Sequence, residues 1–146
     1  MELGDNRAMS TIFTKIINGE IPGRFVWADE VCVAFATIEP HTDGHVLVVP
    51  RLEVDSYVDA PDDVVAHLAV VAKRIGAAQV RVFEAPRAGL VVAGYGVDHL
   101  HLHVVPRWAG DANFMTVIGG TKVLPQLLRE TRALLAEGVD VILQHT

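Results

Sequence analysis

The chain has 146 residues, of which 51% are hydrophobic, and its formal net charge is −6 at pH 7. This length suits one domain with its own core, and the apolar content excludes general disorder. The acidic balance argues against binding to nucleic acid or to anionic membranes, which require basic surfaces. The single Cys32 excludes an internal disulfide. With no signal peptide and no apolar run long enough for a membrane span, we expect a cytoplasmic protein.

The first half of the chain reads as one helix and three strands. Residues 1–9 are expected to form a disordered extension of a single domain that spans 1–146. Apolar residues then recur at helical spacing from Thr11 to Glu20, and the pattern stops at Asn18-Gly19. Three strands are predicted next from β-branched, aromatic or continuous apolar residues, at Phe25–Ala28, Val31–Ile38 and His45–Pro50.

The second half reads as a long helix, two strands and a last helix. Acidic residues after Pro61 start a helix whose apolar periodicity runs from Val64 to about Phe83. A fourth strand is predicted at Gly89–Ala93, and a fifth ends at Pro106. A last helix is predicted over Val123–Glu137. Consecutive strands with short links favour an antiparallel sheet with helices packed on one face, in the α+β class.

The segment before Pro106 alternates strictly between apolar and polar residues. Strand geometry then places every second side chain on the same face. The apolar set points into a core and the polar set away from it: Leu100, Leu102 and Val104 against His99, His101 and His103. Neighbours on one face stand roughly 6–7 Å apart. The three imidazoles can therefore act on one small group lying across them, but they are too far apart for each to bond the next.

Three roles for these histidines are open from the residues alone. A purely structural role is disfavoured, because burying three partly charged rings is costly. A metal site is possible if another element supplies a ligand, and His45 or Glu53 are the candidates. Nucleophilic catalysis on phosphorus uses all three rings: His101 attacks, His103 donates a proton or hydrogen bond to the leaving group, and His99 orients the centre. The backbone amides of Gly94 and Gly96, in the turn just before, can approach a phosphate closely.

Three stretches resemble the histidine triad family of nucleotide hydrolases and transferases. His99–Val105 matches the signature His-φ-His-φ-His-φ-φ, in which φ is apolar. Thr11–Pro22 is similar to the opening helix of that family, and Gly44–Arg51 to the strand that begins Gly-His. The similarity covers almost the whole chain.

The resemblance implies a five-stranded antiparallel sheet with two main helices, and a homodimer that joins two sheets into one. It implies purine nucleotide substrates, which are phosphoramidates, aminoacyl or sulfated adenylates, and dinucleoside polyphosphates. His101 would be adenylylated at the α-phosphate, and water, or phosphate in phosphorylase relatives, would release the nucleotide. His45 would join the same polar cluster. The base pocket would be walled by five apolar residues: Ile12, Phe13, Ile16, Phe35 and Ile38.

Departures from the family pattern carry information too. Many bacterial relatives hold zinc with a Cys-x-x-Cys pair, a later histidine and a triad histidine. Three of those positions correspond here to Thr11, Thr14 and Glu53, which indicates a metal-free branch without a cofactor. Thr37 stands where relatives present an acidic residue or Asn to the ribose hydroxyls, and Gly94-Tyr95-Gly96 replaces a Gly-Gln pattern.

After the triad, Pro106–Phe114 and Thr121–Pro125 resemble the diadenosine tetraphosphate hydrolases and phosphorylases, so Arg107 and Lys122 are candidate contacts to distal phosphates. The sequence thus predicts a nucleotide hydrolase or transferase that acts through nucleotidyl-His101. A diadenosine tetraphosphate phosphorylase is the alternative within the enzymes. A non-catalytic nucleotide-binding interaction protein is the alternative of another class.

Overall fold

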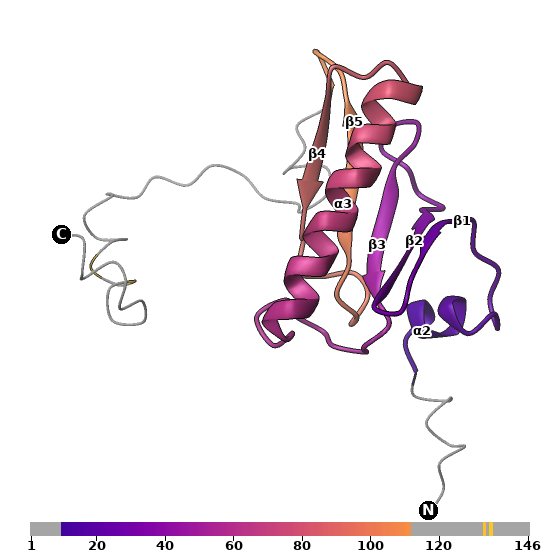
Figure 1. The fold of residues 1–146 in the computed structure, drawn as a ribbon, viewed down its shortest axis with the longest axis vertical. Helices are drawn as coiled ribbons and strands as arrows, with labels where there is room; N and C mark the ends of the chain where they lie inside the picture. The colour runs from indigo at the N-terminus through magenta and orange to yellow at the C-terminus, as the bar shows by residue number, and fades with distance from the viewer. Residues whose placement is uncertain (1–9, 112–132, 134, 136–146) are drawn as a thin grey trace, which may run out of the picture.

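The computed structural model describes residues 10–111, 133 and 135 (Figure 1). The expected extension over 1–9, Lys122 and the predicted last helix over 123–137, apart from Ala133 and Leu135, lie outside the described residues; Ala133 and Leu135 are helical. The elements in chain order are α2 (Ile12–Ile17), β1 (Phe25–Ala28), β2 (Cys32–Ala36), β3 (Val46–Pro50), α3 (Asp62–Val82), β4 (Arg87–Val91) and β5 (Leu102–Arg107).

The five strands form one antiparallel sheet in the order β1-β2-β3-β5-β4. The last strand along the chain therefore lies between β3 and β4, and it places the histidine segment beside the strand that follows His45. The predicted α+β class and five-stranded antiparallel sheet are confirmed.

The two helices cover opposite faces of the sheet, so the prediction that helices pack on one face is wrong. Along β2 and β3 both sets of alternate side chains are buried, which leaves two apolar faces to cover. The side chains of Ala34 and Val48 pack with those of α3, as Figure 1 shows for the ribbons. Those of Phe35 and Leu47 pack with Phe13 and its neighbours on α2.

β5 begins three residues later than the sequence predicts. Val48 of β3 pairs with Leu102 of β5, so two residues further along the same register the partner on β3 would be Pro50. Proline has no N–H for the ladder, and its carbonyl oxygen accepts from the His99 ring at 2.8 Å. The backbone N–H of Leu100 instead donates to the carbonyl of Val54 at 2.7 Å. The ladder therefore stops at Leu102, and His99 and His101 lie on the segment leading into the strand.

Smaller differences concern the ends of β2 and β4. β2 ends at Ala36, which pairs with the first residue of β3, Val46. Ile38 consequently lies in the loop and is 93% exposed. β4 runs from Arg87, which pairs with Arg107, to Val91, two residues earlier than predicted. Among the helices that the structure describes, none is long and apolar enough to cross a membrane.

Candidate active site

His101 is held with one ring nitrogen unprotonated. Its Nδ1 lies 2.7 Å from the carbonyl oxygen of His99. A carbonyl oxygen only accepts hydrogen bonds, so Nδ1 carries the proton, and the neutral ring keeps a lone pair on Nε2. The ring also packs edge-on against Phe13, at a centroid distance of 5.0 Å. The backbone thus fixes both the tautomer and the direction of this imidazole.

A second chain of hydrogen bonds fixes the opposite tautomer in His103. The backbone N–H of His41 donates to Nδ1 of His45 at 3.1 Å, so the proton of neutral His45 is on Nε2. That Nε2 lies 3.0 Å from Nδ1 of His103 and donates to it. His103 must then carry its own proton on Nε2. The structure thus brings His45, which the family resemblance assigns to the polar cluster, into contact with His103.

Burial keeps this pair of imidazoles neutral near pH 7. Desolvation lowers the pKa of His45 to about 4, and the charge of His41 adds to the effect. Desolvation also lowers the pKa of His103 to about 4, with further contributions from the charges of His101, His45 and His41. The pair therefore offers a neutral N–H donor.

Of the three triad rings, His101 and His103 line the cleft of about 730 Å³ described below, whereas His99 does not. His99 is completely buried, and both of its ring nitrogens are bonded. Its Nε2 donates to the carbonyl of Pro50 at 2.8 Å, and its Nδ1 accepts from the hydroxyl of Thr11 at 2.7 Å. Desolvation lowers its pKa as well. His99 therefore reaches the reacting position only through its backbone carbonyl, which holds His101.

A cleft of about 730 Å³ opens in front of His101 and His103. All five predicted base-pocket residues line it: Ile12, Phe13, Ile16, Phe35 and Ile38. Thr37 and Gly96 also line it. Phe13 and Phe35 meet edge-on, at 5.6 Å between ring centroids, and form its floor. This volume and its mostly apolar wall suit a planar base.

Other predicted site residues lie elsewhere. Gly94 and His99 line a smaller cavity of about 200 Å³ that also touches His101. Gly94 and Gly96 have φ of 90° and 105°, which a residue with a side chain rarely adopts. Arg107 lines neither cavity, and its Nε donates to Asp111 at 2.9 Å. The described basic side chains that line the cleft are instead Arg24 and His41, beside His101 and His103. Sequence reasoning missed Arg24 and His41, since only the strand order brings their loops to the triad.

The positions where zinc is expected in relatives do not fit a zinc ion here. Thr11, Thr14 and Glu53 do lie together, because Glu53 Oε1 accepts from the Thr11 N–H at 2.7 Å and from the Thr14 hydroxyl at 2.8 Å. Zinc sites use thiolates, imidazoles and carboxylates. The one imidazole in reach, His99, uses both nitrogens for hydrogen bonds. The polar groups of Thr11, Thr14 and Glu53 thus form hydrogen bonds with one another and with His99 instead of presenting ligands to a metal ion.

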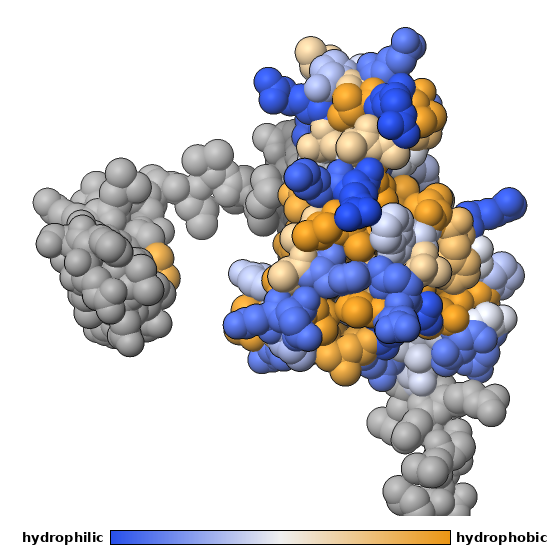
Figure 2. Space-filling model, viewed as in Figure 1, coloured by the Kyte–Doolittle hydropathy of each residue, from blue (hydrophilic) through white to orange (hydrophobic). Residues whose placement is uncertain are grey.

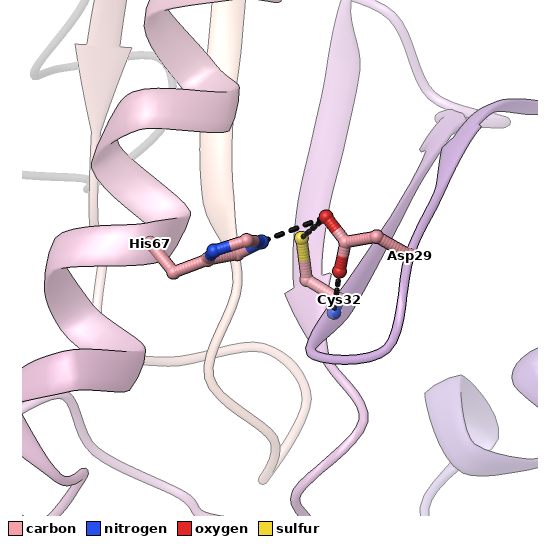
Figure 3. Close-up of side chains that lie close together, drawn as sticks. All are labelled: Asp29, Cys32 and His67. Carbon is pink, nitrogen blue, oxygen red and sulfur yellow. Dashed lines mark hydrogen bonds and ion pairs between the residues drawn. The ribbon is translucent and has the colours of Figure 1, made fainter.

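A second cluster lies on the other face, where His67 of α3 meets the turn between β1 and β2 (Figure 3). Asp29 Oδ2 accepts from His67 and from Trp27, at 2.7 Å each, and Oδ1 accepts from the N–H of Cys32 at 2.8 Å. Desolvation raises the pKa of the fully buried Cys32 thiol to about 12, so it stays protonated. These groups suit a structural clamp better than a metal centre, because the carboxylate is already saturated with donors.

Comparisons with known proteins agree with this geometry. The family model of the HIT domain matches residues 18–110. The chain is 39% identical over 124 residues to the "AP-4-A phosphorylase" of Mycobacterium tuberculosis, covering 78% of this chain but 62% of that protein. It is 37% identical to an uncharacterized HIT-like protein of Methanocaldococcus jannaschii, covering 68% of this chain and 81% of that one.

Solved structures share the fold. A zinc-bound histidine triad family protein from Mycobacterium smegmatis superposes with a TM-score of 0.69 at 30% identity, over 90% of this chain and 99% of that one. A HIT family protein from Bacillus anthracis gives a TM-score of 0.71 at 28% identity, over 88% and 96% of the two chains. From the family match, the relatives and the shared fold, the chain belongs to the HIT family.

Proposed function

We propose that the protein is a nucleotide hydrolase that cleaves the α-phosphate bond of purine nucleoside phosphoramidates or dinucleoside polyphosphates, through a covalent nucleotidyl-His101 intermediate. One observation carries the proposal: the carbonyl of His99 forces the proton of His101 onto Nδ1 and leaves Nε2 as a nucleophile beside a cleft of about 730 Å³. Neutral imidazole is a good nucleophile and a good leaving group at phosphorus.

In the first step, the Nε2 lone pair of His101 attacks the α-phosphorus, and the bond from phosphorus to the leaving oxygen or nitrogen breaks. The leaving group gains electron density as this bond lengthens. His103 has its proton on Nε2, because His45 supplies the hydrogen bond at Nδ1, so its N–H can donate a hydrogen bond to the leaving atom. A leaving phosphate departs as an anion, a leaving amine takes its proton from solvent water, and the hydrogen bond lowers the barrier in both cases.

In the second step, water attacks the phosphorus of nucleotidyl-His101, the N–P bond breaks, and its electron pair returns to Nε2. The attacking water gives its proton to solvent, and His103 keeps its proton on Nε2 throughout. The free mononucleotide leaves, and His101 recovers its unsubstituted Nε2. The residues of the site carry the whole cycle, and we propose that it uses no metal.

Phosphorolysis is a second candidate, favoured by the 39% identity to a protein named AP-4-A phosphorylase. In that reaction inorganic phosphate replaces water in the second step. The alignment covers 62% of that relative, so the likeness extends to the triad domain and not to the rest of that protein.

The products distinguish these reactions. We expect incubation with a phosphoramidate of AMP to give AMP. Hydrolysis of diadenosine tetraphosphate gives AMP with ATP, whereas phosphorolysis gives ADP with ATP and requires added phosphate. Binding of both compounds without turnover would instead identify a nucleotide-binding protein that lacks catalysis.

The nucleophile is tested with His101→Ala, and the control is His67→Gln, which changes an imidazole on the other face of the sheet. Acid quenching of the wild type during turnover should trap a peptide that carries His101 plus one nucleotidyl group. His101→Ala should lose both the adduct and turnover, while His67→Gln keeps them. Full turnover by His101→Ala would exclude the proposed intermediate.

We also propose a homodimer that joins two sheets through β4. Among the strands that the structure describes, β4 is at the edge of the sheet and pairs only with β5. Its Leu90 is 52% exposed, and on the neighbouring α3 Val80 and Val82 are 39% and 66% exposed. Figure 2 shows apolar side chains among the charged ones on this face. Burying an open strand edge with apolar flanks favours association of two copies.

A further inference from the structure

We propose that Glu53, Thr11 and Thr14 are positioning residues that set the orientation of the nucleophilic imidazole of His101. They do so by hydrogen bonds that tie the start of α2 to the segment before β5. The kinetic part of this inference rests on the proposed function, whereas its structural part does not.

The three residues form a closed cluster around one carboxylate oxygen. Glu53 Oε1 accepts from the backbone N–H of Thr11 at 2.7 Å and from the Thr14 hydroxyl at 2.8 Å. The Thr11 hydroxyl in turn accepts from the backbone N–H of Thr14 at 3.1 Å, which caps α2. The hydrogen bonds from Thr11 and Thr14 lower the pKa of the Glu53 carboxyl, so it is ionised at neutral pH.

The cluster continues into the triad. The single hydroxyl proton of Thr11 goes to Nδ1 of His99 at 2.7 Å, because the alternative acceptor, the Thr14 hydroxyl, is farther away at 3.3 Å. The other nitrogen of His99 donates to the Pro50 carbonyl. With both ring nitrogens held, the backbone of His99 is fixed, and its carbonyl oxygen accepts from Nδ1 of His101.

These hydrogen bonds matter because the carbonyl of His99 is not held by the ladder of β5, which begins at Leu102. The segment from His99 to His101 lies outside β5, and the cluster and the Leu100 to Val54 hydrogen bond are what hold it. α2 is six residues long and has little stability of its own. A nucleophile must be placed within a fraction of an ångström, and small misplacements cost large factors in rate. The hydrogen bonds from Glu53 to His101 supply this placement.

Two matched pairs of variants distinguish the loss of the hydrogen bonds from the loss of side-chain volume. Thr11→Val removes the hydroxyl at nearly constant volume, and Thr11→Ser retains it. Glu53→Ala removes the acceptor, whereas Glu53→Gln retains an amide oxygen for the two donors. The control is Glu20→Ala, an exposed carboxylate just after α2 that takes no part in the cluster.

We expect kcat with the phosphoramidate of AMP to fall roughly ten-fold in Thr11→Val and Glu53→Ala. Thr11→Ser, Glu53→Gln and Glu20→Ala should stay within about two-fold of the wild type, since each leaves the hydrogen bonds in place. The dissociation constant of AMP should hardly change in any of them. Phe13 and Ile16 keep α2 anchored in the core.

The readout independent of turnover is the ¹⁵N spectrum of the imidazoles. In the wild type we expect His99 to be protonated on Nε2 and His101 on Nδ1. Thr11→Val and Glu53→Ala should give averaged shifts for His101, as a mixture of tautomers does. Added zinc or a chelator should leave these spectra and the unfolding temperature unchanged.

Unchanged kcat together with an unchanged His101 spectrum in Thr11→Val and Glu53→Ala would overturn the inference, as would a zinc-dependent shift of His99. If the wild type turned over none of the nucleotides, the proposed function would fail. The spectra would then still decide whether the cluster sets the tautomer of His101.

Discussion

The two imidazoles at the cleft carry their protons on opposite nitrogens. His101 is protonated on Nδ1 because a backbone carbonyl faces it, and His103 on Nε2 because His45 donates to its other nitrogen. One ring can therefore attack phosphorus with its lone pair, while its neighbour, 5.1 Å away between centroids, can donate a hydrogen bond. Residues of one type acquire different roles from their hydrogen-bond partners alone.

The first prediction concerns pH and the buried imidazoles. Their pKa is near 6.5 when unfolded and about 4 in the fold for His45 and His103. As pH falls from 6.5, the unfolded state takes up protons first, so the free energy of unfolding should fall until about pH 4 and then stop falling on this account. At about 1.4 kcal/mol per pKa unit, we expect a loss on the order of 3 kcal/mol for each of the two imidazoles.

Urea unfolding at a series of pH values measures this loss. Replacing His103 by Asn should reduce the slope between pH 6.5 and 4, because one group that charges only on unfolding is gone. Below about pH 4.5 the carboxylates Glu53 and Asp29, whose pKa values are lowered in the fold, take over the dependence. A stability that does not change between pH 6.5 and 5 would contradict the prediction.

The second prediction concerns the cations of the cleft. Arg24 lines the cleft, whereas Arg107 is engaged with Asp111. We expect Arg24→Ala to raise KM for diadenosine tetraphosphate about five-fold, on the order of 1 kcal/mol, since a partly solvated ion pair is worth about that much. KM for the phosphoramidate of AMP should change less. The control is Arg81→Ala, an exposed cation on α3, and equal effects of both variants on both substrates would contradict the assignment.

At the scale of elements, the turn between β1 and β2 is clamped by Asp29. Burial alone would raise its pKa, but hydrogen bonds from Trp27, Cys32, His67 and Val31 together lower it well below the ordinary value. The carboxylate thus joins the first hairpin to α3 (Figure 3). Because Asp29 and His67 are 38 residues apart, this contact could not be predicted before the helix was placed on the sheet.

The third prediction is that Asp29→Ala lowers the free energy of unfolding by about 2–3 kcal/mol, since several donors lose a charged acceptor. Glu30→Ala, an exposed change in the same turn, should have little effect. The stabilisation by Asp29 is present above its unfolded pKa near 3.8 and is lost as pH falls toward its lower folded pKa. The difference between Asp29→Ala and the wild type in chemical denaturation should therefore shrink below pH 3.8.

Helices and strands with a clear hydrophobic periodicity could be predicted from the sequence. The residues at which they end and the strands with which they pair were harder to predict. Alternation in the histidine segment correctly predicted a strand whose apolar side faces a core. It did not reveal that β5 starts at Leu102, because that depends on Pro50, more than 40 residues away on β3. The contact between His45 and His103 likewise requires the register of β3 against β5, which a period does not encode.

At the scale of the whole molecule, both edges of the sheet carry exposed apolar residues, which gives a matched test of the dimer. Leu90 on β4 is 52% exposed, and Val26 on β1, at the other edge, is 57% exposed. We expect Leu90→Lys to shift the protein from dimer to monomer in sedimentation velocity, because a buried unpaired charge at a strand edge opposes pairing.

Val26→Lys should remain dimeric, since β1 is not the joining edge. Both changes are at exposed positions, so circular dichroism should show folded protein in each case. Because α2, the cleft and the triad lie on the opposite face from α3, the Leu90→Lys monomer should still bind AMP. A dimer that survives Leu90→Lys but dissociates with Val26→Lys would place the joint at β1, next to the cleft that Phe35 of β2 helps to line.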